Sequence, residues 1–154
     1  VGVTTVRELW AVDEELLRRA FGARGSAVWR SCRGLDDTPV KETPVLQSIS
    51  RETSFEPRAE VGSQQRAFLR SMLGYLLDRA TSELRAQRHL ARTVQVRLRH
   101  VDGSAGERAR TLAEPTDRTD VCMVAAGELL DELLLRRVLV RLVGVTLSSL
   151  APPG

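Results

Sequence analysis

The sequence predicts an α+β fold: a four-stranded antiparallel βαββαβ (ferredoxin-like) sheet with two helices on one face, preceded by a small all-α segment. Three observations predict it. Residues 93–101 alternate between apolar and polar, which is the period of a strand. Residues 63–88 carry apolar side chains at helical spacing. The remaining elements complete the order strand, helix, strand, strand, helix, strand.

The first segment reads as short helices. Thr5 followed by Glu8 has the spacing of a capping box, and Asp13 is a second N-cap candidate. A third helix is predicted over 26–33, ended by Gly34. Its inward-facing side chains are predicted to be Val28, Trp29 and Cys32.

A linker is predicted after these helices. Residues 38–46 have no clear period, and Pro39 and Pro44 each bias the preceding residue towards extended backbone. The predicted organisation is therefore a helical segment over 1–37, the linker, and a second domain over 47–150.

The elements of the second domain follow from periodicity. Strands are predicted over 48–55, 93–101, 107–113 and 138–148, with the middle two forming a hairpin. A second helix is expected to be capped by Thr116 or Asp117. The apolar face of the long helix is predicted to comprise Ala67, Leu69, Met72, Leu73, Leu76, Leu77, Ala80 and Leu84.

The hairpin carries two pairs of arginines. Arg97 and Arg99 lie two residues apart and therefore share a face of their strand, and Arg108 and Arg110 do the same on the paired strand. We expect the four guanidinium groups to lie close together. Like charges on neighbouring strands repel, so a polyanion is the expected partner, and arginine fits phosphate oxygens with two hydrogen bonds. The alternative is a solvated strand face.

Neutral groups near these strands can donate hydrogen bonds to phosphates. Phe55 is the only aromatic residue in a predicted strand, so stacking on unpaired bases is not predicted. Backbone contact to a duplex is the favoured mode of nucleic-acid binding. The hydroxyl residues concerned are Ser48, Ser50, Thr53, Thr93 and Thr111.

Other chemistry is not indicated. Cys32 and Cys122 lack the spacing of a metal site and read as reduced thiols. Asp36 and Asp37 are consecutive in extended chain, where side chains diverge. There is no glycine-rich phosphate loop, so neither a catalytic nor a metal site is predicted. The sequence shows no membrane span and no signal peptide, and a cytoplasmic location is expected.

Four blocks of the sequence resemble the Y-family, or translesion, DNA polymerases of the bacterial DNA polymerase IV type. The blocks occur in the order found in that family and together cover essentially the whole chain. They are CRGLDDTPV (32–40), QSISRETSF (47–55), RARTLAEPTD (108–117) and RLVGVTLS (141–148).

The resemblance implies that 1–37 belong to the thumb and that 47–150 form the little finger, which docks its sheet in the major groove of duplex DNA and contacts backbone phosphates. The catalytic palm of the family, whose acidic residues hold magnesium, is absent, so no cofactor is expected in this chain. The expected DNA contacts carried over from the family are Ser48, Ser50, Arg51, Arg108, Arg110 and Thr111, beside Arg97 and Arg99 from the residue pattern.

The expected function is therefore DNA binding by part of a lesion-bypass polymerase, active in translesion synthesis and DNA repair. Other polymerase domains or mutagenesis factors are further expected partners. One alternative is a protein-interaction module of a non-catalytic accessory factor, with Val140 and Leu142 exposed on the sheet. Another is a ligand-binding regulatory domain, although no glycine-rich effector loop is present.

Overall fold

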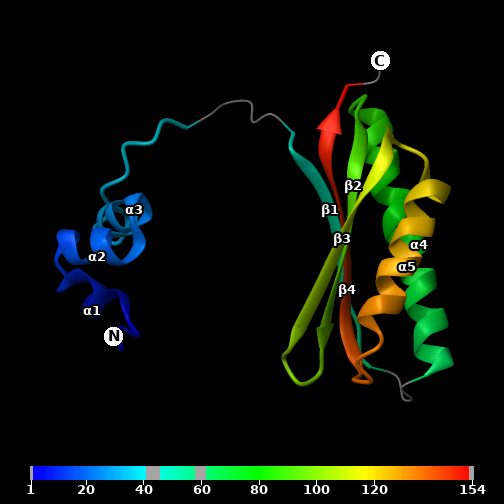
Figure 1. The fold of residues 1–154 in the computed structure, drawn as a ribbon, viewed down its shortest axis with the longest axis horizontal. Coiled ribbons are helices and arrows are strands. Elements are labelled where there is room, and N and C mark those ends of the chain that lie inside the picture. The colour runs from blue at the N-terminus through cyan, green and yellow to red at the C-terminus, as the bar shows by residue number, and fades with distance from the viewer. Residues whose placement is uncertain (1, 41–45, 58–61, 153–154) are drawn as a thin grey trace. The chain divides into compact units, whose positions relative to one another are not determined.

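A computed structural model describes residues 2–40, 46–57 and 62–152. The chain divides into two compact units, Val1–Pro44 and Val45–Gly154 (Figure 1). The elements are α1 (Val6–Trp10), α2 (Glu14–Phe21), α3 (Ala23–Ser31), β1 (Ser48–Ser54), α4 (Ser63–Ala86), β2 (Leu90–His100), β3 (Ala105–Thr116), α5 (Thr119–Leu133) and β4 (Val140–Ala151).

Both predicted N-caps of the first unit are confirmed. The Thr5 hydroxyl accepts from the Glu8 amide at 3.2 Å, and the Glu8 carboxylate accepts from the Thr5 amide at 3.1 Å. Asp13 accepts from the Glu15 amide at 2.8 Å and so caps α2. These bonds satisfy amides that have no partner inside a helix.

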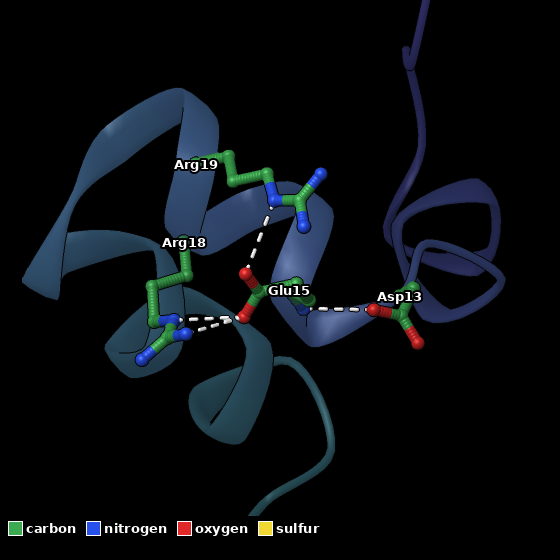
Figure 2. A network of polar contacts seen from close by, with 4 residues as sticks. All are labelled: Asp13, Glu15, Arg18 and Arg19. Carbon is green, nitrogen blue, oxygen red and sulfur yellow. Dashed lines mark hydrogen bonds and ion pairs between the residues drawn. The ribbon is translucent and has the colours of Figure 1, made fainter.

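Glu15 also organises the exposed face of α2 (Figure 2). Its carboxylate accepts from Arg18 Nε at 2.9 Å and from Arg19 Nε at 3.1 Å. One carboxylate therefore binds the arginines three and four residues later in the helix. All three side chains are largely exposed, so each pair contributes only a few tenths of a kcal/mol, about 0.3 to 0.5.

The third helix departs from expectation. It begins at Ala23 rather than at residue 26, because Gly22 adopts a positive φ of 62° that reverses the chain and lets α3 start at once. Gly25 then packs against the backbone of Leu17. Val28, predicted to face inward, is 42% exposed, while Trp29 and Cys32 are half-buried.

The second unit confirms the α+β class. Its four strands are ordered β1-β4-β2-β3, and every neighbouring pair is antiparallel. β4 lies between β1 and β2, so the crossover through α4 spans an intervening strand, as a split βαβ unit requires. Both helices cover the same face of the sheet: α4 contacts chiefly β4 and β1, and α5 contacts β2 and β3 (Figure 1).

The core lies between this helix layer and the sheet. Val94, Val96 and Leu98 of β2 are fully buried beneath the helices, as their alternation predicted. Most of the predicted apolar face of α4 is buried; Ala67 is exposed, because it lies two residues before Leu69 and therefore on another side of the helix. The buried α4 residues are Leu69, Leu73, Leu76, Leu77, Ala80, Thr81 and Leu84.

The start of α5 was also predicted wrongly. Thr116 ends β3, and its hydroxyl accepts from the Arg118 amide at 3.1 Å in a local turn instead of capping the helix. Arg118 occupies the N-cap position without a side-chain bond, and α5 begins at Thr119. The Thr119 hydroxyl instead lies 2.7 Å from that of Thr81 and links the two helices.

Candidate nucleic-acid interface

The sheet face that points away from α4 and α5, here called the open face, is built by the strand register. Alternate residues of each strand project from it, and directly paired residues project to the same side. The pairing aligns these residues into four rows across β1, β4, β2 and β3. The rows are Ser48–Ser148–Thr93–Thr111, Ser50–Thr146–Gln95–Ala109, Glu52–Gly144–Arg97–Glu107 and Ser54–Leu142–Arg99–Ala105.

The first two rows form a hydroxyl end of the open face. All four residues of the first row are serine or threonine, and in the second row the Ser50 and Thr146 hydroxyls lie 2.8 Å apart. Such short side chains leave the backbone accessible to a large, flat or convex partner. The Thr93 hydroxyl likewise lies 3.0 Å from that of Ser149, and each hydroxyl that does not already donate to such a neighbour can donate to one oxygen acceptor.

The other two rows form a charged end. Arg97 lies directly opposite Glu107 on β3, and Arg99 lies in the last row. Arg99 also lines a surface hollow together with Arg141, which occupies a bulge where β4 departs from regular pairing with β2. Two guanidinium groups therefore border one hollow at the edge of the open face. Its other lining residues are Ser54, Phe55, Glu56, Pro57, Val101 and Leu142.

The prediction that four hairpin arginines share one face is wrong. Arg108 pairs with Val96 and Arg110 pairs with Val94, two residues buried beneath the helices. Arg108 and Arg110 therefore project to the helix side of β3, whereas Arg97 projects to the open face. The arginines alternate correctly within each strand, but the register places the two pairs on opposite faces.

Contacts on the helix side support this placement. Arg110 forms ion pairs with Glu128 and Glu132 of α5. Arg51 likewise projects to the helix side, since it pairs with the buried Val145, and its guanidinium donates to the Ser50 carbonyl at 2.9 Å. Arg110 and Arg51 are therefore engaged by groups of the second unit itself.

The structure therefore brings together Ser48, Ser50, Arg97, Arg99 and Thr111 and separates from them Arg51, Arg108 and Arg110. Sequence reasoning missed several further residues of the open face. Alternation along 142–148 carried the signal for the β4 residues, but their neighbours are known only from the register. The missed residues are Glu52, Glu107, Arg141, Thr146 and Ser148.

The expectation that Val140 is exposed is also wrong. Val140 is 1% exposed and belongs to the core, because the bulge at Arg141 turns it towards the helices. Leu142 does lie on the open face, where it is half-buried. A single aliphatic side chain does not make an apolar docking patch.

Other site chemistry is not supported. Within residues 2–40, 46–57 and 62–152, no three His, Cys, Asp or Glu residues are grouped so as to hold a metal ion. Burial raises the pKa of the Cys122 thiol to about 11, with Asp120 and Asp117 adding to the shift, which disfavours its reactive thiolate. In the part of the chain described, no helix is long and apolar enough to cross a membrane.

Comparison with known proteins agrees with this architecture. The profile of the impB/mucB/samB family C-terminal domain matches residues 46–154. The chain is 34% identical over 154 residues to DNA polymerase IV of Desulfatibacillum aliphaticivorans, covering all of this chain and 38% of that protein. It is 34% identical over 151 residues to DNA polymerase IV of Streptomyces coelicolor, covering 97% of this chain and 30% of that protein.

Solved structures show the same fold. A Y-family DNA polymerase chimera of Dbh and Dpo4 superposes with a TM-score of 0.69 at 18% identity, over 99% of this chain and 42% of that one. An insertion ternary complex of Dbh DNA polymerase superposes with a TM-score of 0.59 at 16% identity, over 99% of this chain and 42% of that one.

A split βαββαβ sheet with one polar face, matched by this profile, defines the C-terminal domain of a polymerase-like protein. The chain belongs to the impB/mucB/samB family of Y-family DNA polymerases and is similar to their DNA polymerase IV type. It spans about 38% of the length of the first of these relatives.

Proposed function

We propose that the open face binds the sugar–phosphate backbone of duplex DNA and that the chain serves as the DNA-gripping part of a lesion-bypass polymerase. The observation that carries the proposal is the hydroxyl end beside Arg97, Arg99 and Arg141. Hydroxyls and guanidinium groups are the side chains that contact phosphate oxygens without reading sequence.

The shape of the open face favours backbone contact over base recognition. None of its four rows contains an aromatic side chain, so there is no platform on which an unpaired base can stack. Phe55 follows β1 and packs edge-to-face against Phe68 of α4, with ring centroids 5.0 Å apart. Binding is therefore expected to tolerate any duplex sequence.

The names of the relatives support DNA as the partner. The curated relatives are DNA polymerases, and the alignment covers essentially the whole of this chain. Because the chain spans a minor part of their length, nucleotide transfer by the whole protein, lesion bypass and the role of the first unit as a thumb are parts of the same proposal.

The test measures how tightly the 154-residue chain binds a labelled DNA duplex. Fluorescence anisotropy of the duplex gives the affinity at several salt concentrations. We expect Arg97→Ala/Arg99→Ala to weaken binding to all sequences alike. Each lost phosphate contact should reduce the slope of log affinity against log salt by about 0.9.

Arg110→Ala is the matched control, because it removes the same charge from the same hairpin but on the helix side. Its affinity should change less than that of either open-face single variant, Arg97→Ala or Arg99→Ala. Equal losses in all three single variants would show that the net charge, and not the open face, governs binding, and unchanged affinity in the Arg97/Arg99 pair would refute the proposal.

A further inference from the structure

The row Glu52–Gly144–Arg97–Glu107 places two carboxylates on the face proposed to meet phosphates. The four rows of the open face hold two arginines and two glutamates, so their formal charges cancel. A surface selected only for tight phosphate binding would not be expected to carry these two acids.

Both glutamates lie close to Arg97. Glu107 is its direct partner on β3, one strand spacing or about 5 Å away. Glu52 is two strands away, about 10 Å, and the intervening residue is glycine. A Cβ atom at Gly144 would lie 3.0 Å from Glu52 Cβ and 3.6 Å from Glu52 Oε2, so the Glu52 side chain extends over the space that Gly144 leaves free.

Neither carboxylate is neutralised by an ion pair. Among the residues that the structure describes, no ion pair joins Glu52 or Glu107 to a basic group, whereas Glu128 and Glu132 both pair with Arg110. Glu128 and Glu132 on the helix side are thus engaged by Arg110, whereas Glu52 and Glu107 on the open face have no ion-pair partner among the described residues.

We infer that Glu52 and Glu107 weaken the grip of the open face on duplex DNA. This inference rests on the proposed function. A phosphate that reaches Arg97 comes within about one Debye length, roughly 8 Å at physiological salt, of at least one of the carboxylates and is repelled. The charged row therefore weakens the contact between Arg97 and a phosphate without abolishing it.

The test compares Glu52→Gln, Glu107→Gln and the double variant with the unmodified chain by duplex anisotropy. Each single change should tighten binding by about twofold and the double change by about fourfold, with a steeper dependence on salt. Asp78→Asn is the matched control: it removes one negative charge from an exposed position of α4, in the helix layer. Its affinity should change by less than either glutamate variant.

Thermal unfolding of each variant separates this role from a structural one. Glu107 opposite Arg97 is also a favourable cross-strand pair, so a purely structural role would lower the melting temperature and leave affinity at the level of the Asp78→Asn control. Glu107→Ala provides a second variant should Glu107→Gln fail to fold.

The two proposals fail in different ways. If the glutamate variants bind no tighter than the Asp78→Asn control while Arg97→Ala/Arg99→Ala still binds weakly, the inference is overturned and the open-face proposal stands. If the arginine pair has no effect on binding, the open-face proposal fails and the inference fails with it.

Discussion

At the scale of single residues, the partner opposite a side chain decides what that side chain does. Arg97 and Arg110 lie on the two strands of one hairpin and carry the same group, yet Arg97 faces outward opposite Glu107 while Arg110 is held by α5. An arginine already engaged by two carboxylates must lose them before it binds a phosphate. Among the residues that the structure describes, neither Arg97 nor Arg99 forms an ion pair that a phosphate would have to displace.

Cys122 gives a prediction at this scale. Its thiol is fully buried, and burial raises its pKa to about 11, so the native chain at pH 8 holds almost no thiolate there. In a Cys32→Ser variant, which keeps only Cys122, we expect iodoacetamide to label the native protein far more slowly than the urea-unfolded protein. Mass spectrometry reads the labelling, and equal rates in the two states would contradict the prediction.

The raised pKa of Cys122 also makes the free energy of unfolding depend on pH. The unfolded thiol, with an ordinary pKa near 9.0, releases its proton before the folded thiol does. The unfolded state therefore binds fewer protons between pH 9 and 11, and the free energy of unfolding falls as the pH rises through that window. Below pH 9 this group adds no pH dependence.

At the scale of elements, α4 shows how a helix forms despite an unfavourable residue. It runs for 24 residues, and its buried leucines face the sheet, where the helix contacts β1 and β4. This tertiary packing outweighs the weak helical preference of Gly74. The same packing explains why the helix was predictable over nearly its whole length. Its N-cap residue is Gly62, which provides no side-chain hydrogen bond to the first turn.

Gly74→Ala should therefore stabilise the protein. A Cβ at Gly74 meets nothing within 4 Å, so alanine adds no clash and restricts the unfolded chain. We expect the free energy of unfolding to rise by about 0.5 to 1 kcal/mol, measured by urea denaturation with circular dichroism.

Gly103→Ala is the control for that measurement. Gly103 lies in the turn between β2 and β3 with a φ of 83°, where a side chain is strained, so alanine should destabilise by about 1 kcal/mol. Two glycine-to-alanine changes of opposite sign would show that backbone conformation, not composition, governs the effect.

At the scale of the whole molecule, the two units differ in how much they bury. The second unit has a continuous core of aliphatic side chains, whereas in the first unit Leu17 and Gly25 are buried and several large apolar residues are not. The exposed ones include Val6 at 63%, Trp10 at 57% and Phe21 at 65%. The first unit is expected to be much the less stable of the two.

Gly25→Ala should unfold the first unit selectively. A Cβ at Gly25 would lie 2.1 Å from the Leu17 carbonyl oxygen, so α2 and α3 must move apart. Both tryptophans, Trp10 and Trp29, lie in this unit, so tryptophan fluorescence reports on it alone. We expect the fluorescence transition to move to lower urea while the β-sheet signal in circular dichroism keeps its midpoint.

Gly2→Ala, where a Cβ meets nothing within 4 Å, is the control for the first unit. A common shift of the fluorescence and sheet transitions in Gly25→Ala would show instead that the two units unfold together.

The element types, their order and the α+β class could be predicted from the sequence, because periods of two and of about 3.6 residues are local properties of the chain. The caps at Thr5 and Asp13 were predictable for the same reason: each bond spans no more than three residues. The start of α5 was not, since β3 continues to Thr116 and the Thr116 hydroxyl accepts from the Arg118 amide in a turn instead of capping the helix.

Which residues share the open face depends on the pairing between strands and could not be predicted. Alternation along β3 predicts that Arg108 and Arg110 project from the same face of the sheet. It does not predict whether that is the face of Arg97, because a shift of one residue in the register moves every side chain of a strand to the opposite face. The turn at 101–104 sets that register by pairing Arg99 with Ala105, and it thereby opposes Arg97 with Glu107 instead of an arginine. Glu52 and Arg97 are neighbours across Gly144 because β4 lies between β1 and β2. This strand order depends on the packing of the helices over the sheet rather than on any local sequence pattern.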